Sequence, residues 1–285
     1  MSGMQALGRA NAGNNRTMLR VLAEHNPALA RMLPMGKYLV LGPRNPESIA
    51  TEVVHSLMSL GGEVAVTCFD EKTSGRMRDF FESVGVTAVL PCDVTDKAQI
   101  EHALRTLRDV HGWKQLNGIV HSIAFTKQFG SMLEADDEAI DAAVRVSALS
   151  FRTVIRTALA FDMLAPRSSS VALGYRAYAR HPETEYDGPM FAAKAILRAE
   201  VGSLSQTLAR NGKHRVNLVS PGPIPTKAAM GIPGFPEILK RFQKESPMGD
   251  EPITKENVAD LVAFLMSEAG QNINNQDIAI DCGRD

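Results

Sequence analysis

Residues 37–69 read KYLVLGPRNPESIATEVVHSLMSLGGEVAVTCF and carry the pattern that decides the fold. A short apolar run, Lys37–Gly42, stops at glycine and is typical of a buried strand. Ser48 then stands as a candidate N-cap before apolar residues at helical spacing, which continue to Leu60 and end at two glycines. Glu63–Phe69 follows as a second apolar run. The stretch therefore predicts a strand, a helix and a second strand, the unit from which parallel sheets are built.

The same alternation runs through the rest of the chain. Further strands are expected at Ala88–Pro91, Leu116–Ser122, Ser169–Leu173, Arg215–Ser220 and Gln276–Asp281. Helices are expected at 74–84, 97–111, 138–160, 189–210 and 254–267. Strands that alternate with helices predict right-handed βαβ crossovers, and short apolar strands predict burial of both sheet faces. We expect one α/β domain over 37–285, a single doubly wound parallel (Rossmann) sheet flanked by helices.

Residues 1–36 stand apart as an N-terminal helical extension. Leu19, Leu22 and Leu29 lie near helical spacing, with Pro27 as an interruption, so one or two short helices are expected. The arginines and the lack of any acid before Glu24 are also compatible with a transit peptide. The preferred interpretation is an extension that packs on the body of the protein or on another subunit.

Composition narrows the class of protein. The 285 residues are 44% hydrophobic and 22% charged, with a net charge of −1, so neither nucleic acid nor an anionic membrane is an expected partner. No apolar run approaches the length of a membrane-spanning helix. Three widely spaced cysteines predict neither a disulfide framework nor a metal site, and they fit a reduced, cytoplasmic setting.

In a doubly wound sheet, ligands bind where the carboxyl ends of the strands meet. The first turn, Gly42 to Ala50, has a single opening glycine and no GxGxxG motif. The Ser48 hydroxyl and the first free amides of the following helix, from Ile49 onward, could nevertheless hold a pyrophosphate. The alternative is that this segment is simply a turn.

The second strand ends at Phe69-Asp70, where the adenosine ribose of a dinucleotide would lie. An acid at this place accepts a hydrogen bond from the ribose 2′-hydroxyl and repels a 2′-phosphate. Asp70 therefore favours NADH over NADPH, while the neighbouring Lys72 leaves NADPH possible. A solvated loop is the alternative.

Three further strand ends complete the expected cofactor site. Asp93 and Val94 follow the third strand, at the adenine position, and Ser122 and Ile123 follow the fourth, under the nicotinamide ribose. His121 is expected to be a structural residue rather than a catalyst.

After the sixth strand, the turn Pro221–Thr226 would aim backbone groups, including those of Ile224, at the nicotinamide carboxamide. Thr226 would then reach the phosphates. Taken alone, this motif is simply a loop rich in proline and glycine.

The stretch 174–200 carries the candidate chemistry. It contains Tyr175, Tyr178 and Tyr186, and then Lys194 on an alanine-rich helix. A nearby ammonium favours a phenolate and lowers a tyrosine pKa from its ordinary value near 10. Such a phenol could donate a proton or hold a developing oxyanion near neutral pH. A surface tyrosine beside a solvated lysine is the alternative.

Taken in order over 37–285, these features resemble the short-chain dehydrogenase/reductase superfamily, and within it the divergent branch of enoyl-acyl-carrier-protein reductases. The stretches that carry the resemblance to this branch are HSIAF at 121–125 and GPIPTKAAMGI at 222–232. The resemblance implies transfer of a hydride from NAD(P)H to an enoyl thioester, with acyl carrier protein as a candidate partner, in fatty-acid synthesis or a specialised acyl pathway.

By the same resemblance, Tyr186 would stabilise the enolate oxygen or relay a proton. Lys194 would hold the nicotinamide ribose, and Tyr175 would be the second active-site tyrosine. Residues 226–242 would form a mobile substrate lid. The resemblance also implies a homotetramer built through the helices at 138–160 and 189–210.

The chain departs from the family pattern before the second of these helices. Seven residues separate Tyr186 from Lys194, where the family has six, so Asp187 aligns with the catalytic tyrosine unless a one-residue bulge restores Tyr186. Two alternatives therefore stay open. The scaffold could reduce a different carbonyl or unsaturated substrate in a secondary pathway, or it could be a non-catalytic nucleotide-binding member with a remodelled site.

Overall fold

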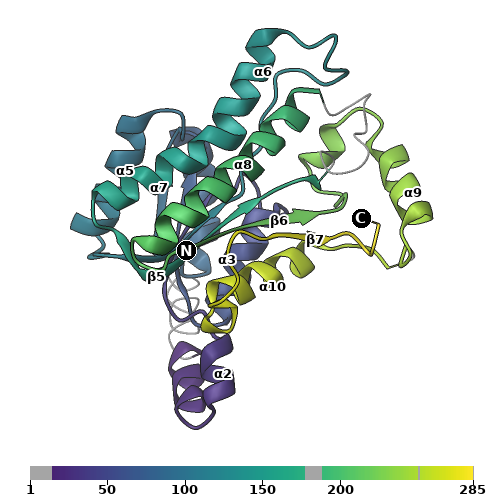
Figure 1. The fold of residues 1–285 in the computed structure, drawn as a ribbon. Coiled ribbons are helices and arrows are strands. Elements are labelled where there is room, and N and C mark those ends of the chain that lie inside the picture. The colour runs from purple at the N-terminus through teal and green to yellow at the C-terminus, as the bar shows by residue number, and fades with distance from the viewer. Residues whose placement is uncertain (1–14, 177–187, 250, 285) are drawn as a thin grey trace.

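The computed structural model describes residues 15–176, 188–249 and 251–284, which build one sheet between two layers of helices (Figure 1). Its strands are β1 (Lys37–Leu41), β2 (Glu63–Cys68), β3 (Ala88–Pro91), β4 (Leu116–His121), β5 (Leu164–Leu173), β6 (Arg215–Pro221) and β7 (Asp277–Ile280). All neighbours run parallel, in the order β3-β2-β1-β4-β5-β6-β7. The expected α/β class and doubly wound parallel sheet are confirmed.

Each central strand buries both of its faces, because successive side chains alternate between two apolar layers. In β1, Tyr38 and Val40 belong to one core cluster, while Leu39 and Leu41 belong to the other, and all four are almost fully buried. This explains why β1 appears in the sequence as a continuous apolar run instead of an apolar–polar alternation.

The helices divide between the two faces of the sheet (Figure 1). One core cluster is completed by α3 (Ile49–Ser59), α4 (Glu71–Ser83) and α10 (Lys255–Met266). The other is completed by α5 (Lys97–Asp109), α7 (Ser150–Ala160) and α8 (Gly188–Arg210). For α3, α4, α5, α7 and α8 this split follows from right-handed crossovers that leave β1 in one direction and β4 in the other. Helix α10 differs, because it packs on the α3 face although β7 extends the sheet beyond β6.

The long helix expected at 138–160 is continuous but not uniform. It consists of α6 (Asp137–Val144), a π-helical segment at Arg145–Leu149, and α7. In the π-helical segment, the Ser147 hydroxyl accepts a hydrogen bond from the Phe125 amide at 2.9 Å. The irregular turn therefore holds the loop that follows β4, which is the kind of place where π-helical turns are often found.

The described part of the N-terminal extension, residues 15–36, packs against the amino-terminal edge of the sheet, away from the strand ends that face the expected site. Residues 15–24 are helical, and α2 (Pro27–Met32) follows them. The Asn15 side chain donates to the Ser59 carbonyl, and Arg16 forms an ion pair with Glu63 at the start of β2. In Figure 1 this purple part of the chain projects from the body. Among the helices of the described residues, none has the length and apolarity needed to cross a bilayer.

Candidate active site

The chain adds strands on one side of β1 and then, from β4 onward, on the other side. At this switch point, the loop after β1 touches the loop after β4. Gly42 ends β1 with a φ of +99°, in the left-handed region that favours glycine. A Cβ at Gly42 would stand 2.4 Å from the Ser122 carbonyl oxygen. The single glycine of this turn therefore serves both the backbone conformation and the close approach of the loop after β4.

The first turn of α3 opens beside Gly42. The Ser48 hydroxyl accepts from the Thr51 amide at 3.2 Å and pairs with the Thr51 hydroxyl at 2.9 Å, so it acts as the helix cap. The amides of Ile49 and Ala50 make no hydrogen bond within the described part of the chain. Two free amide donors at a helix N-terminus suit an anion, which fits the pyrophosphate of a dinucleotide.

Asp70, just after β2, caps the following helix and lies near two cations. Its carboxylate accepts from the Thr73 amide at 2.7 Å and so caps α4. The Thr73 hydrogen bonds, aided by Lys72 and Arg44, lower the pKa of Asp70 below its ordinary value. Phe69, just before it, is 56% exposed. An apolar ring and an ionised acid thus stand together where an adenosine would lie.

After β3, Asp93 organises the turn that leads into α5. Its carboxylate accepts from both the amide and the hydroxyl of Thr95, at 2.8 and 2.7 Å, while its own amide donates to Gln99. Val94 is buried in the core. Local hydrogen bonds therefore hold the turn, and they use one oxygen of the Asp93 carboxylate, Oδ1.

Lys194 is a buried cation that connects two strand ends. Its ammonium nitrogen donates to the Leu173 carbonyl at 2.7 Å and to the Ile123 carbonyl at 3.3 Å. Only 5% of the residue is exposed, and burial lowers its pKa from 10.5 to about 8. The ammonium can still donate one more hydrogen bond, because it carries three protons. The structure thus places Lys194 at the carboxyl ends of β4 and β5, where the sequence expects the nicotinamide ribose.

His121, the last residue of β4, is fully buried beneath this lysine. One ring nitrogen, Nε2, lies 2.7 Å from the Ser150 hydroxyl, which donates its own proton to the Val146 carbonyl. The ring must therefore carry its proton on Nε2. Burial, and then the Lys194 charge, lower the pKa of His121 to about 3. A ring that stays neutral and packed in the core supports the structural role expected for it.

The candidate tyrosines begin just after β5. Tyr175 follows Gly174 and is half-buried, whereas Tyr178, Tyr186 and Asp187 lie outside the described residues. The Arg176 guanidinium faces the Asp277 carboxylate at 3.6 Å, and the same carboxylate accepts from the Ser220 hydroxyl at 2.7 Å.

Gly174 is packed tightly against this group. A Cβ at Gly174 would stand 2.5 Å from the Ser220 oxygen. The backbone at Tyr175 is therefore held on both sides. Gly174, before it, packs closely against Ser220 because it has no side chain, and Arg176, after it, pairs with Asp277.

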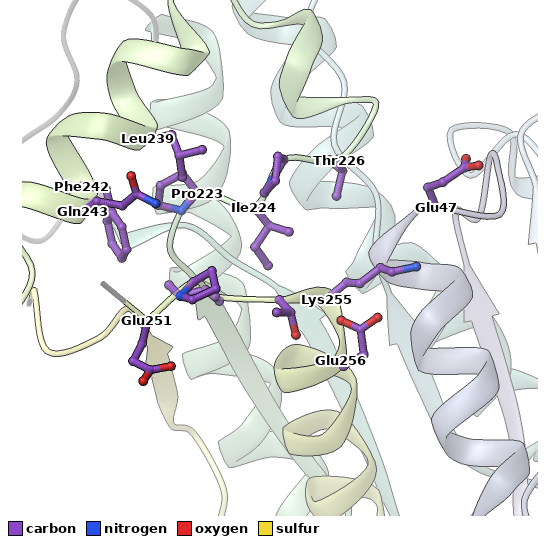
Figure 2. A pocket seen from close by; sticks show the side chains of 14 residues that line it. Glu47, Pro223, Ile224, Thr226, Leu239, Phe242, Gln243, Glu251, Lys255 and Glu256 are labelled. Carbon is purple, nitrogen blue, oxygen red and sulfur yellow. The ribbon is translucent and has the colours of Figure 1, made fainter. Parts of the chain in front are cut away.

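The loop after β6 lines a cavity of about 350 Å³ (Figure 2). Ile224 and Thr226 form one side, and Leu239 and Phe242 come from α9 (Phe235–Glu245). The opposite rim carries charged residues from the α3 and α10 ends, namely Glu47, Lys255 and Glu256. The Thr226 hydroxyl accepts from the Ala229 amide at 3.2 Å and keeps its own proton for another acceptor.

Some residues of this region could not be found from the sequence. Ser147 and Ser150 tie the long helix to the ends of β4, but a π-helical turn leaves no pattern of spacing. Asp277 and Ser220 meet only because β6 and β7 are neighbours in the sheet. The sequence predicts the last strand, but it does not show that this strand pairs with β6.

The fold and the site together define a class of protein. A doubly wound parallel sheet, free amides at the switch-point helix and a buried lysine at the ends of β4 and β5 are those of a nucleotide-dependent reductase of the short-chain dehydrogenase/reductase superfamily. The comparisons with known proteins agree. The family model described as "Enoyl-(Acyl carrier protein) reductase" matches residues 42–285.

Two curated relatives and two solved structures specify the branch. The NADH enoyl-[acyl-carrier-protein] reductase FabI of Salmonella typhimurium is 32% identical, over 87% of this chain and 93% of the relative. That of Aquifex aeolicus is 31% identical, over 86% and 89%. A crystal structure of the Aquifex aeolicus reductase superposes with a TM-score of 0.82 at 28% identity, over 89% of this chain and 97% of that one. A FabI–NADH complex from Alistipes finegoldii gives 0.82 at 26% identity, over 89% of each chain. The chain belongs to the enoyl-(acyl carrier protein) reductase family.

Proposed function

We propose that this chain reduces the carbon–carbon double bond of an enoyl thioester with NADH, as an oxidoreductase of fatty-acid synthesis. The observation that carries the proposal is the buried Lys194 ammonium at the ends of β4 and β5. It supplies the positive potential that a developing enolate requires, in a place from which water is largely excluded. The relatives named above, which are NADH enoyl-[acyl-carrier-protein] reductases, support the choice of substrate and cofactor.

The cofactor fits the polar groups at the carboxyl edge of the sheet. The free amides of Ile49 and Ala50 would hold the pyrophosphate, together with the spare proton of Thr226. The third ammonium proton of Lys194 would reach the nicotinamide ribose. NADH, when bound, supplies the hydride that goes to the β-carbon of the substrate.

The adenosine end would be held near the ends of β2 and β3. Asp70 is ionised and would accept from the ribose 2′-hydroxyl, which favours NADH, and Phe69 offers an exposed ring beside it. Gly42, which packs against Ser122 and Ile123, would contact the cofactor between its adenosine and nicotinamide ends. Asp93 and Val94 would border the adenine, with the second carboxylate oxygen of Asp93 available for it because both Thr95 hydrogen bonds go to Oδ1.

Three side chains would act on the substrate. The Tyr186 phenol would donate a hydrogen bond to the thioester oxygen as charge develops there, and would relay the proton that completes the reduction at the α-carbon. Lys194 would keep that phenol acidic through its charge. Tyr175, on the backbone segment fixed by Arg176 and Asp277, would orient the thioester. Ile224 and α9 would cover the acyl chain with apolar surface.

The partners follow from the proposed reaction. The substrate would be carried by acyl carrier protein, with Arg176 and Lys227 as the candidate contact residues at the site mouth among the described residues. The chain would assemble as a homotetramer through the α6–α7 and α8 helices. It would work in the cytoplasm, since Cys68 and Cys92 face opposite core clusters and are free thiols.

The test is a titration followed by a turnover assay. Purified protein is titrated with NADH and NADPH by nicotinamide fluorescence, and crotonyl thioester is then added while absorbance loss is followed. Turnover with NADH that falls in Tyr186→Phe and Lys194→Ala supports the proposal. Binding of NADH without turnover of any enoyl thioester contradicts it, and a panel of carbonyl substrates then tests the alternative reduction. Failure to bind either nucleotide removes both enzymatic functions.

A further inference from the structure

Residues 281–284 pack against the turn that follows α9, and we call them the 281–284 segment. The Cys282 carbonyl accepts from the Met248 amide at 3.2 Å, and the Cys282 thiol donates to the Glu251 carbonyl at 3.4 Å. Gly283 lies beside the Pro247 ring. In Figure 1 the yellow end of the chain accordingly approaches the light green α9. The 281–284 segment therefore packs against the turn at the C-terminal end of α9, the helix that lines the cavity.

Arg284 makes the direct contacts to α9. Its guanidinium nitrogen Nη2 lies 2.7 Å from a carboxylate oxygen of Glu245, the last residue of the helix. The same guanidinium stands over the Phe242 ring, with its central carbon 5.6 Å from the ring centroid. A planar guanidinium can pair with a carboxylate and stack on an aromatic face at the same time, which an ammonium does less well.

Phe242 is held from the other side by the end of β6. Only 3% of the residue is exposed, and a Cβ at Gly222 would stand 2.7 Å from its ring. Gly222 is itself fixed by the hydrogen bond that its amide donates to the Ile280 carbonyl at the end of β7. The ring is thus confined between a backbone surface and the Arg284 guanidinium.

This confinement sets one side of the cavity. Phe242 and Leu239 are both lining residues, one helical turn apart, and Ile224 and Thr226 lie across from them (Figure 2). A shift of the Phe242 ring would move α9 relative to the loop after β6. The position of α9 therefore depends on a residue that lies outside the cavity and outside the cofactor site.

We propose that Arg284 is a positioning residue for the acyl substrate, which it serves by holding the C-terminal turn of α9 against the end of β6. The inference rests on the proposed function, in which α9 covers the acyl chain. Arg284 touches neither substrate nor cofactor, so its effect must appear in acyl binding and in the order of α9, rather than in the chemical step.

The experiment compares Arg284→Gln, Arg284→Lys and the control Lys240→Gln, which removes an exposed positive charge from the same helix. In Arg284→Gln, the KM for crotonyl thioester should rise about fivefold, because an ion pair and a stacked cation are lost together. Its kcat and its KM for NADH should stay within about twofold. Arg284→Lys should recover part of the loss, and Lys240→Gln should match the wild type.

Hydrogen exchange of residues 236–245, measured on the full-length protein, gives the second readout. Faster exchange there in Arg284→Gln, with unchanged exchange in β1 and β4, supports the proposal. Unchanged exchange together with an unchanged acyl KM overturns it. If the wild type reduces no enoyl thioester, the proposed function fails on its own, and the exchange data still decide whether Arg284 holds α9.

Discussion

The Lys194 ammonium nitrogen lies 2.7 Å from the carbonyl oxygen of Leu173, so a charge from the second turn of α8 is fixed at the end of β5. A second bond, to the Ile123 carbonyl, extends the same cation to the loop after β4. Lys194 therefore has a structural function as well as the proposed catalytic one, and the two can be separated by experiment.

Loss of the Lys194 charge should stop turnover and change how stability depends on pH. Because burial lowers its pKa to about 8, the ammonium is present below pH 8 and is lost above it, so kcat/KM for the enoyl thioester should fall as the pH rises through 8. Lys194→Met should lower turnover by at least about 100-fold at pH 7.

The contribution of Lys194 to the free energy of unfolding should change with pH in the direction opposite to that of turnover. Between pH 8 and 10.5 the unfolded chain keeps the Lys194 proton that the folded protein has released. The free energy of unfolding of the wild type should therefore rise relative to that of Lys194→Met, by up to about 1.4 kcal/mol per pH unit. Urea denaturation at pH 7, 8 and 9.5 measures this difference, and a constant difference would contradict the assigned burial.

Replacement of Tyr186 tests which residue occupies the position of the catalytic phenol. Tyr186→Phe should lower kcat about 100-fold and leave the Kd for NADH unchanged, because the ring stays and only the proton donor is lost. Asp187→Asn is the matched change at the next position and should have less than a threefold effect. The reverse pattern would place Asp187 in the site and would favour a different reaction.

Removal of the Asp70 charge should relax the choice of cofactor. Asparagine caps a helix as well as aspartate does, so Asp70→Asn should keep α4 intact. It should nevertheless raise the ratio of kcat/KM for NADPH over NADH by about fivefold or more, because the repulsion of a 2′-phosphate disappears while Arg44 and Lys72 remain. Glu71→Gln, which removes the neighbouring exposed charge, should alter that ratio less, and an equal change in both variants would argue against a specific role for Asp70.

Ser150→Ala should destabilise the fold without removing a catalytic group. The change leaves the buried Nε2–H of His121 without an acceptor, which costs about 1–3 kcal/mol. The control is Thr153→Ala on the same helix, since the Thr153 hydroxyl also donates to the carbonyl four residues earlier but serves no buried ring. Its effect on the free energy of unfolding, measured by urea denaturation, should be below about 0.5 kcal/mol. Equal effects would mean that the imidazole proton has another partner.

Most of the sheet could be predicted from the sequence, because apolar runs that stop at glycine or proline mark both the strands and their ends. The beginning of β5 was not predicted, since Pro166 and the left-handed Arg167 interrupt its first half. Most of helix α9 falls within residues 226–242, which were predicted to form a mobile loop, so the helix itself was not predicted. Pro233 and Gly234 resemble a loop, whereas Pro236 is compatible with the first turn of a helix.

The candidate site was less accessible to the same reasoning. Patterns place Asp70 and Thr226 after strand ends and Lys194 on the helix that follows β5, and the structure brings these residues to one edge of the sheet. The sequence does not show which of the polar groups at this edge already make hydrogen bonds within the protein. The Ser48 hydroxyl and one oxygen of the Asp93 carboxylate both turned out to be used by their own turns, which only three-dimensional contacts reveal.

The pairing of β1 with β4 also determines when a nascent chain acquires its binding cleft. Leu41 lies opposite His121 in the register of the sheet, 80 residues later in the sequence. A ribosome-bound chain that has not yet exposed Leu116–His121 can form the β1–β2–β3 portion but has no wall on the other side of Gly42. Cofactor added during synthesis should therefore stabilise only chains whose β4 has emerged, so nucleotide binding follows the formation of the first three strands rather than nucleating it.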